Sequence, residues 1–167
     1  VASRFHAKMG EVFVLPEAKV QEDTMLVPGT DGEKMSKSKN NIIDIFQDDK
    51  KLRKQVMTIQ TDSTPMEEPK DPDTCNVFAL YKLLASDEKT KQMRTNYEAG
   101  GYGYGHAKQA LFEEITSQFG DVRASYSYYM THLEELESIL AHGASKATAV
   151  ADEVLNRVRT RLGYQIS

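Results

Sequence analysis

"GASKATAVADEVLNRVRTRLG", residues 143–163, has the clearest helical pattern in the chain and indicates its fold class. Its apolar residues recur every three or four positions, and this spacing places them along one face of an α-helix. We expect Gly143 to end the helix before it and Gly163 to end this one, because glycine commonly terminates helices. The apolar stripe consists of Ala147, Val150, Ala151, Val154, Leu155, Val158 and Leu162.

Helical spacing continues from this stretch back towards Asn41. The intervening segment 61–73, rich in proline and acidic residues, indicates an exposed connection. The sequence therefore predicts a mainly α protein, with a helical bundle over residues 42–167. The further helices are expected around residues 45–59, 77–84, 107–115 and 122–140, with a weaker helical stretch at 87–97.

The first 40 residues have a different pattern. Val12–Leu15 reads as a short buried strand, and Met25–Val27 as a second extended segment. An independent sheet generally needs three or more strands. Residues 1–41 are therefore expected to be the remnant of a larger α/β domain, and the first residue, Val1, agrees with a chain that is part of a longer protein.

Composition excludes several classes of protein. Cys75 is the only cysteine, which rules out an internal disulfide framework and a cysteine-rich zinc site and suits the cytoplasm. No apolar run reaches the roughly 20 residues of a membrane span, and no signal peptide is recognisable. A net charge of −4 argues against extensive coating of nucleic acid but leaves a local basic patch open.

A basic loop, "PGTDGEKMSKSKNN", lies at residues 28–41. Lys34, Lys37 and Lys39 alternate there with the hydroxyls of Ser36 and Ser38. Lysine ammonium groups bind phosphate oxygens, and a helix expected to start near Asn41 would add an N-terminus that favours anions. From composition alone the loop is either a solvated surface loop or a phosphate-binding device.

The segment Lys34–Ser38, "KMSKS", matches the second signature motif of class I aminoacyl-tRNA synthetases. "RFHAKMGEVFVLPEA" at 4–18, "TDS" at 61–63, "GYGYGHAK" at 101–108 and the stretch quoted first narrow the resemblance. Over essentially its whole length the chain resembles the C-terminal half of bacterial-type tryptophanyl-tRNA synthetases. The tyrosyl enzymes, the larger class I synthetases and a non-catalytic helical module that binds nucleic acid or protein remain as alternatives.

The resemblance implies a Rossmann-type origin for residues 1–41 and a tRNA anticodon-binding role for residues 42–167. It implies an enzyme that activates tryptophan with ATP and Mg²⁺ and then charges tRNA(Trp). Lys34 and Lys37 would contact the triphosphate, and Lys37 would neutralise charge in the transition state. The remaining ATP contacts would come from Ser36 and Ser38, from Met35 as a loop anchor, and from Met25 and Leu26 near the adenine.

The last predicted helix carries the residues expected to contact tRNA. Arg157 and Arg161 are four residues apart and share a helical face, and Lys146 lies at its start. Tyr128 is the tyrosine expected to be exposed for base stacking, whereas Tyr126 and Tyr129 fit a buried stripe. The alternative for each arginine is a solvated polar face.

The first signature motif of the family, a His-x-Gly-His-like element, is not formed by His6, His106, His132 or His142. We therefore expect this chain to lack the first half of the active site and to form no adenylate alone. No metal-ligating set is recognised. The full-length relative is expected to be a cytoplasmic homodimer without membrane contact.

Overall fold

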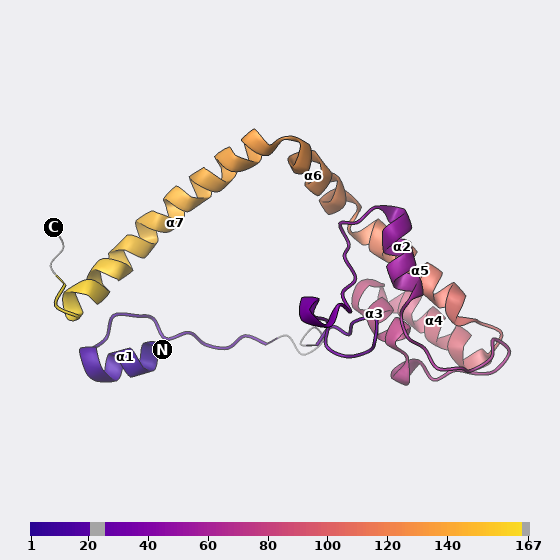
Figure 1. Ribbon diagram of the computed structural model, residues 1–167. Coiled ribbons are helices and arrows are strands. Elements are labelled where there is room, and N and C mark those ends of the chain that lie inside the picture. Colours follow the sequence, from indigo (N-terminus) through magenta and orange to yellow (C-terminus); the bar gives the residue numbers. More distant parts are fainter. Residues whose placement is uncertain (21–25, 165–167) are drawn as a thin grey trace. The chain divides into compact units, whose positions relative to one another are not determined.

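The computed structural model describes residues 1–20 and 26–164, and in these residues the chain is mainly α with no β-strand (Figure 1). Contacts divide the chain into two compact units, Val20–Ser127 and a second unit formed by Val1–Lys19 with Tyr128–Ser167. The boundary expected after Asn41 falls inside the Val20–Ser127 unit.

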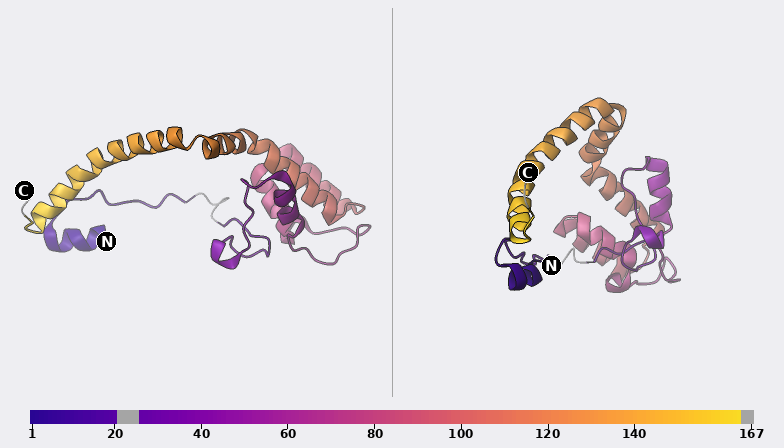
Figure 2. Two further views of the ribbon diagram at one scale, coloured as in Figure 1. Left: turned by 45° about the horizontal axis from the view of Figure 1, so that its top comes forward. Right: turned by 60° about the vertical axis from the view of Figure 1, so that its left-hand side comes forward.

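The Val20–Ser127 unit is built on three packed helices. α5 (Tyr104–Gln118) packs against both α2 (Asp49–Met57) and α3 (Asn76–Leu84), and α4 (Asp87–Ala99) contacts α3. The views in Figures 1 and 2 agree that these four helices gather together. Two short 3₁₀ segments, η2 (Lys37–Lys39) and η3 (Pro72–Thr74), lie in the connections.

The core of this unit follows the predicted helical spacing. The helices expected around 77–84, 87–97 and 107–115 are confirmed as α3, α4 and α5. Cys75, expected to be buried or partly buried, is 8% exposed. The other buried apolar residues are Leu52, Val56, Ile59, Val77, Phe78, Leu80, Tyr81, Met93, Tyr97, Ala107, Leu111 and Ile115.

The helix expected to begin near Asn41 begins instead at Asp49. The Asp48 carboxylate accepts a hydrogen bond from the Lys51 amide at 2.9 Å and so caps the first turn. Aspartate is among the most favourable N-cap residues, which accounts for the later start. Residues 42–48 are therefore part of the connection between the basic loop and α2.

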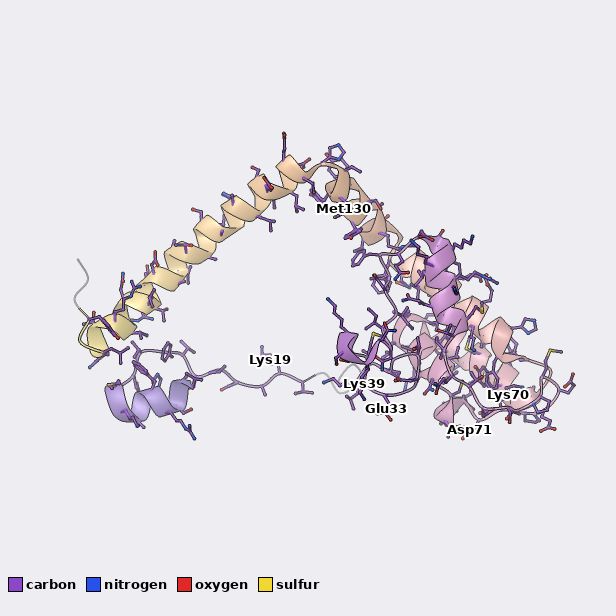
Figure 3. The ribbon with its side chains drawn as sticks, viewed as in Figure 1. Lys19, Glu33, Lys39, Lys70, Asp71 and Met130 are labelled. Atoms are coloured by element: carbon purple, nitrogen blue, oxygen red, sulfur yellow. The ribbon has the colours of Figure 1, made fainter. Side chains whose placement is uncertain are left out.

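The segment 61–73 is organised around a buried lysine. Lys70, which is labelled in Figure 3, is 4% exposed. Its Nζ donates to the carbonyl oxygens of Pro65, Met66 and Glu68 at 2.7, 3.2 and 2.9 Å. A buried ammonium group needs such partners, because an unpaired buried charge is strongly unfavourable. The connection is therefore folded around an internal cation, which its composition did not indicate.

The other unit contains α1 (Ala2–Met9), the end of α6 (Gly120–Thr131) and α7 (Leu133–Arg161). The expectation that Gly143 ends a helix is wrong, since α7 continues through it. A glycine inside a helix costs only about 1 kcal/mol relative to alanine, which a helix of 29 residues tolerates. None of the described helices, α7 included, combines the length and apolar composition required to cross a membrane.

The buried strand expected at Val12–Leu15 is wrong, because this segment is irregular and Val14 is 94% exposed. It packs locally on α1: the Phe13 ring lies 5.2 Å from the Phe5 ring, and the Phe13 amide donates to His6 Nε2 at 3.0 Å. A strand needs paired neighbours. The described residues supply none here, so apolar composition alone did not produce a strand.

The second segment that was predicted to be extended, residues 25–27, also forms no strand in its described part. Met25 lies outside the described residues, and Leu26 and Val27 form no strand. The Val27 carbonyl accepts a hydrogen bond from the Met35 amide at 2.9 Å. An isolated antiparallel bridge joins Pro28 to Lys34, so these residues form the base of a closed loop.

A buried acid links α4 to α5. Glu114 is 5% exposed, and its Oε2 accepts a hydrogen bond from Lys89 Nζ at 2.7 Å. This bond holds the pKa of Glu114 below its ordinary value of 4.5 and raises the pKa of Lys89 above 10.5. The stabilisation from Glu114 is therefore present above about pH 4.5 and is lost as the pH falls through its folded pKa. The stabilisation from Lys89 is present below about pH 10.5 and is lost as the pH rises through the folded-state pKa of Lys89.

We expect Lys89→Met to lower the urea midpoint of unfolding at pH 7, because it leaves the Glu114 carboxylate buried without its cation. The difference from the unsubstituted chain should shrink below about pH 4.5, where protonation of Glu114 removes the pair. Urea unfolding followed by circular dichroism across a pH series measures this. Lys51→Met is the matched control, because Lys51 pairs with the exposed Asp48 and its loss should change the midpoint little. Equal midpoints for the two variants at pH 7 would contradict the prediction.

Candidate functional site

The basic loop is closed by backbone hydrogen bonds at its first half. The Gly29 amide donates to the Glu33 carbonyl at 2.7 Å, and the Gly32 amide donates to the Gly29 carbonyl at 3.1 Å. Gly32 has a φ of +82°, a conformation that glycine adopts without steric cost. The "KMSKS" segment therefore follows immediately after a hydrogen-bonded tight turn.

Asn41 closes the second half of the loop. It is 3% exposed, and its Oδ1 accepts a hydrogen bond from the Ser36 amide at 2.7 Å. Its Nδ2 donates to Asp31 Oδ1 at 2.7 Å and to the Lys34 carbonyl at 3.2 Å. A Cβ atom at Gly29 would lie 2.4 Å from Asn41 Cγ, so Gly29 leaves the space that Asn41 fills.

Asp31 completes this arrangement. The hydrogen bond from the Asn41 side chain holds the pKa of Asp31 below its ordinary value, with a further contribution from the Glu33 amide. That amide donates to Asp31 Oδ1 at 3.0 Å. Asp31 is therefore an ionised acceptor at neutral pH that keeps the Asn41 amide in one orientation.

The lysines of the loop differ in their partners. Lys39 Nζ lies 3.6 Å from Glu33 Oε2 in an exposed ion pair, and both residues are labelled in Figure 3. Lys34 and Lys37 are exposed, and no acidic side chain among residues 1–20 and 26–164 pairs with them within 4.0 Å. These two ammonium groups can therefore bind an anion without first breaking an internal ion pair.

The other loop residues have supporting contacts. The Ser36 and Ser38 hydroxyl oxygens are 2.8 Å apart, and Met35 is half-buried. η2 runs from Lys37 to Lys39 and is followed by Asn40, whose φ is 54°. No α-helix begins at Asn41, so the expected anion-binding helix terminus is wrong for this position.

A pocket of about 490 Å³ lies beside the loop. Leu26 and Val27 line one part of it, and Glu33 and Lys34 line another. Leu26, predicted to lie near an adenine, thus shares a pocket with Lys34, whereas Met25 lies outside the described residues. The combination of an apolar wall with a cation suits a ligand that has both a ring and a charged group.

The base of the loop is tied to the helical core. The Gln60 amide donates to the Thr30 carbonyl at 2.7 Å, and Asn76 Nδ2 donates to the Gln60 carbonyl at 3.2 Å. A Cβ atom at Gly32 would lie 2.6 Å from Asn76 Nδ2. Asn76 is the first residue of α3, so the position of the loop depends on a helix of the core.

Two segments quoted for the family resemblance also meet in this unit. The Tyr104 hydroxyl of "GYGYGHAK" donates to Asp62 Oδ1 of "TDS" at 2.8 Å. Hydrogen bonds from Thr64 and then from Tyr104 hold the pKa of Asp62 below its ordinary value. Burial raises the pKa of Tyr104, so it remains a hydrogen-bond donor at neutral pH.

The candidate tRNA contacts belong to the other unit. Lys146 is exposed on α7, and Tyr128 is 46% exposed with its hydroxyl donating to Glu135 Oε2 at 2.8 Å. Arg157 donates to the Val12 carbonyl at 3.4 Å. Arg161 has its guanidinium against Gly10, so both arginines lie against residues 10–12.

Tyr126 and Tyr129 were expected to be buried. Tyr126 is 43% exposed and stacks on Phe46 with ring centroids 4.6 Å apart, and Tyr129 is half-buried. Tyr128 also stacks on His132 at 4.0 Å. The expectation of full burial for Tyr126 is therefore wrong, because α6 contributes no buried residue.

The "KMSKS" loop, its pocket and the helical core define a class of protein. The family model described as tRNA synthetases class I (W and Y) matches residues 1–120, and the chain belongs to this family. It is 45% identical to the tryptophan–tRNA ligase of Rhodopirellula baltica over 99% of this chain and 52% of that relative. Its identity to the Campylobacter jejuni tryptophan–tRNA ligase is 42% over 98% of this chain and 51% of that relative.

Solved structures give the same result. The crystal structure of tryptophanyl-tRNA synthetase from Campylobacter jejuni, complexed with ADP and tryptophan, matches with a TM-score of 0.82 and 42% identity. The match covers 97% of this chain and 51% of that one. The chain thus spans about half the length of the relatives it matches.

The sequence predicts the loop lysines but not the residues that shape the loop. Asn41, Asp31 and Asn76 are polar residues whose roles depend on contacts across the fold. One signal was available: Asn41 is a short amide side chain shortly after the motif, a position where such residues often bond to nearby backbone.

Proposed function

We propose that the full-length protein is a tryptophan–tRNA ligase that activates tryptophan with ATP and then charges tRNA(Trp). The observation that carries the proposal is the closed "KMSKS" loop, with Lys34 and Lys37 free of ion pairs among the described residues, beside a pocket lined by Leu26. The similarity to tryptophan–tRNA ligases over nearly the whole chain supports the choice of amino acid. The solved relative's complex with ADP and tryptophan supports both substrates.

The proposed first step needs little proton transfer. The tryptophan carboxylate, ionised at neutral pH, attacks the α-phosphorus of ATP, forming a carboxyl–phosphate bond while pyrophosphate leaves. Mg²⁺ enters as part of the ATP substrate complex. Lys34 and Lys37 bind the triphosphate, and Lys37 neutralises charge that grows on the leaving pyrophosphate.

The loop geometry supports further proposed contacts to ATP. Ser36 and Ser38 offer hydroxyl and amide donors, while the half-buried Met35 anchors the segment. Leu26 would contact the adenine from the pocket wall, and Met25 is proposed to adjoin it. Positioning of the triphosphate is the main contribution of this loop to catalysis.

The helical residues are proposed to bind tRNA. In this proposal residues 42–167 form the anticodon-binding domain and residues 1–41 derive from the Rossmann-type catalytic domain. Lys146, Arg157, Arg161 and Tyr128 are the candidate contacts, and phosphate binding by the cations predicts affinity that falls steeply with salt. We also propose a cytoplasmic homodimer for the full-length protein.

Amino-acid-dependent ATP–pyrophosphate exchange by the full-length protein tests the proposal. We expect exchange with tryptophan and at most a trace with tyrosine. Exchange with tyrosine instead would favour the second candidate, a tyrosine-specific enzyme, because the matched family includes both. Absence of exchange with either amino acid would refute the assignment of activity.

A further inference from the structure

We propose that Asn41 is a positioning residue for the nucleotide-binding loop, fixing the shape in which Lys34 and Lys37 meet the triphosphate. The inference rests on the proposed function and adds a residue outside the "KMSKS" motif to it. Asn41 is one of three buried polar or charged residues of the described chain, with Lys70 and Glu114. Unlike those two, all of its side-chain hydrogen bonds stay within the basic loop.

The Asn41 side chain holds two backbone groups of the "KMSKS" motif in place. Its Oδ1 binds the amide of Ser36, and its Nδ2 binds the carbonyl of Lys34. These two backbone groups bracket Met35, so one planar amide sets the path of the chain between them. The Asn41 carbonyl also accepts from the Thr30 amide at 2.9 Å, which joins this clamp to the loop base.

The surroundings of Asn41 restrict which side chains could take its place. Gly29 provides space that a Cβ atom would close, and the Asp31 carboxylate requires a donor from the Nδ2 position. An aspartate at position 41 would set two carboxylates at the 2.7 Å distance now spanned by a hydrogen bond. Like charges at such a distance share a proton rather than both ionise.

The other charged groups near this clamp are few. Lys39 attracts the Asp31 carboxylate and is itself paired with Glu33. Neither group contacts the Asn41 amide through a hydrogen bond that the described residues show. Among charged groups, the effect of a substitution at position 41 should therefore depend chiefly on residue 31, alongside the lost or kept bonds to the Lys34 and Ser36 backbone.

The test measures tryptophan-dependent ATP–pyrophosphate exchange by the full-length protein and its Asn41→Ala and Asn41→Asp variants. We expect each to lower kcat by about 10- to 100-fold, because misplacement of a positioned group by about 1 Å has such effects. The KM for tryptophan should stay unchanged. Asn40→Gly is the matched control, since Asn40 is exposed and glycine keeps its positive φ.

The double variant that combines Asn41→Asp with Asp31→Asn provides a rescue. The side-chain amide now at position 31 can then donate to the carboxylate now at position 41, which still accepts from the Ser36 amide. The exchange removes the repulsion between two carboxylates, but it restores neither the donor to the Lys34 carbonyl nor the acceptor of the Glu33 amide, so the rescue should be partial. The activity of the double variant should therefore exceed that of Asn41→Asp by about ten-fold. Asn41→Asp alone should gain activity relative to the unsubstituted protein as the pH is lowered, because protonation removes the repulsion. A general loss of folding would produce neither result.

The outcomes separate the two levels of the proposal. Unchanged kcat in Asn41→Ala, in a protein whose exchange depends on Lys37, would overturn the role of Asn41 and leave the proposed function intact. A loss that the double variant does not rescue, together with a lower midpoint of thermal unfolding, would also overturn it in favour of a purely structural role. Absence of exchange in the unsubstituted protein would instead refute the proposed function.

Discussion

Replacement of Lys37 by alanine is expected to lower the rate of tryptophanyl-adenylate formation by at least about ten-fold. Removal of one preorganised donor to a transition state typically costs about 100- to 1,000-fold in kcat. Lys37 is exposed at the start of η2, and no acidic side chain of the described residues pairs with it. Its charge is thus available to the leaving pyrophosphate. ATP–pyrophosphate exchange by the full-length protein measures the effect.

Lys39→Ala is the control for this prediction. Lys39 lies two residues further on, is also exposed, and is paired with Glu33. Its removal changes the net charge of the loop by the same amount but should reduce exchange much less. Equal losses in the two variants would mean that the loop acts through its total charge, and unchanged exchange in Lys37→Ala would remove Lys37 from the mechanism.

The helices were predictable where a repeating apolar pattern coincides with a buried face. Val77, Leu80 and Tyr81 recur at helical spacing, and all three are buried in α3. Ala107, Leu111 and Ile115 do the same in α5. Local spacing determines which residues can share a helical face. The buried faces of the three packed core helices can therefore be recognised in the sequence as apolar residues at helical spacing.

The errors arose where tertiary partners decide the outcome. The apolar run Val12–Leu15 is compatible with a strand, yet strand formation needs pairing partners that the described residues lack. The apolar stripe of α7 predicts a helix correctly, but no described residue of α7 is buried. Lys70 looked like part of a solvated connection, because nothing local shows that three carbonyl groups converge on it.

Some residues of the candidate site could be predicted from the sequence, and others could not. The chemistry of Lys34 and Lys37 is carried by a short contiguous motif, so reading the sequence was enough to select them. The shape of the loop depends on Asn41, Asp31 and Asn76, which bond to residues up to 16 positions away in the sequence. Such contacts have no fixed sequence spacing, so they can be identified only in the folded structure.

Tyr97→Ala is expected to give the largest loss of stability, about 3–5 kcal/mol in the free energy of unfolding, as for other large buried aromatic residues. Tyr97 is fully buried, and its ring lies 5.9 Å from the rings of both Phe78 and Tyr102. Its hydroxyl is 3.4 Å from Cys75 Sγ, and burial raises its pKa. The substitution would therefore open a cavity between α3 and α4 and remove a buried hydrogen bond.

Urea unfolding of the substituted protein measures this loss, with Tyr164→Ala as the control because Tyr164 is 67% exposed. Tyr97→Phe separates the two contributions: it keeps the ring and should cost only about 0.5–1.5 kcal/mol for the hydrogen bond.

The cavity that Tyr97→Ala would open also adjoins the start of α3, where Cys75 precedes Asn76, the residue that contacts Gly32 and Gln60. We therefore expect Tyr97→Ala, but not Tyr97→Phe, to raise the KM for ATP, since the base of the nucleotide loop depends on that helix. A stability loss of similar size in Tyr164→Ala would contradict the role of burial in the Tyr97 prediction. An unchanged KM for ATP in Tyr97→Ala would show that core and loop are independent.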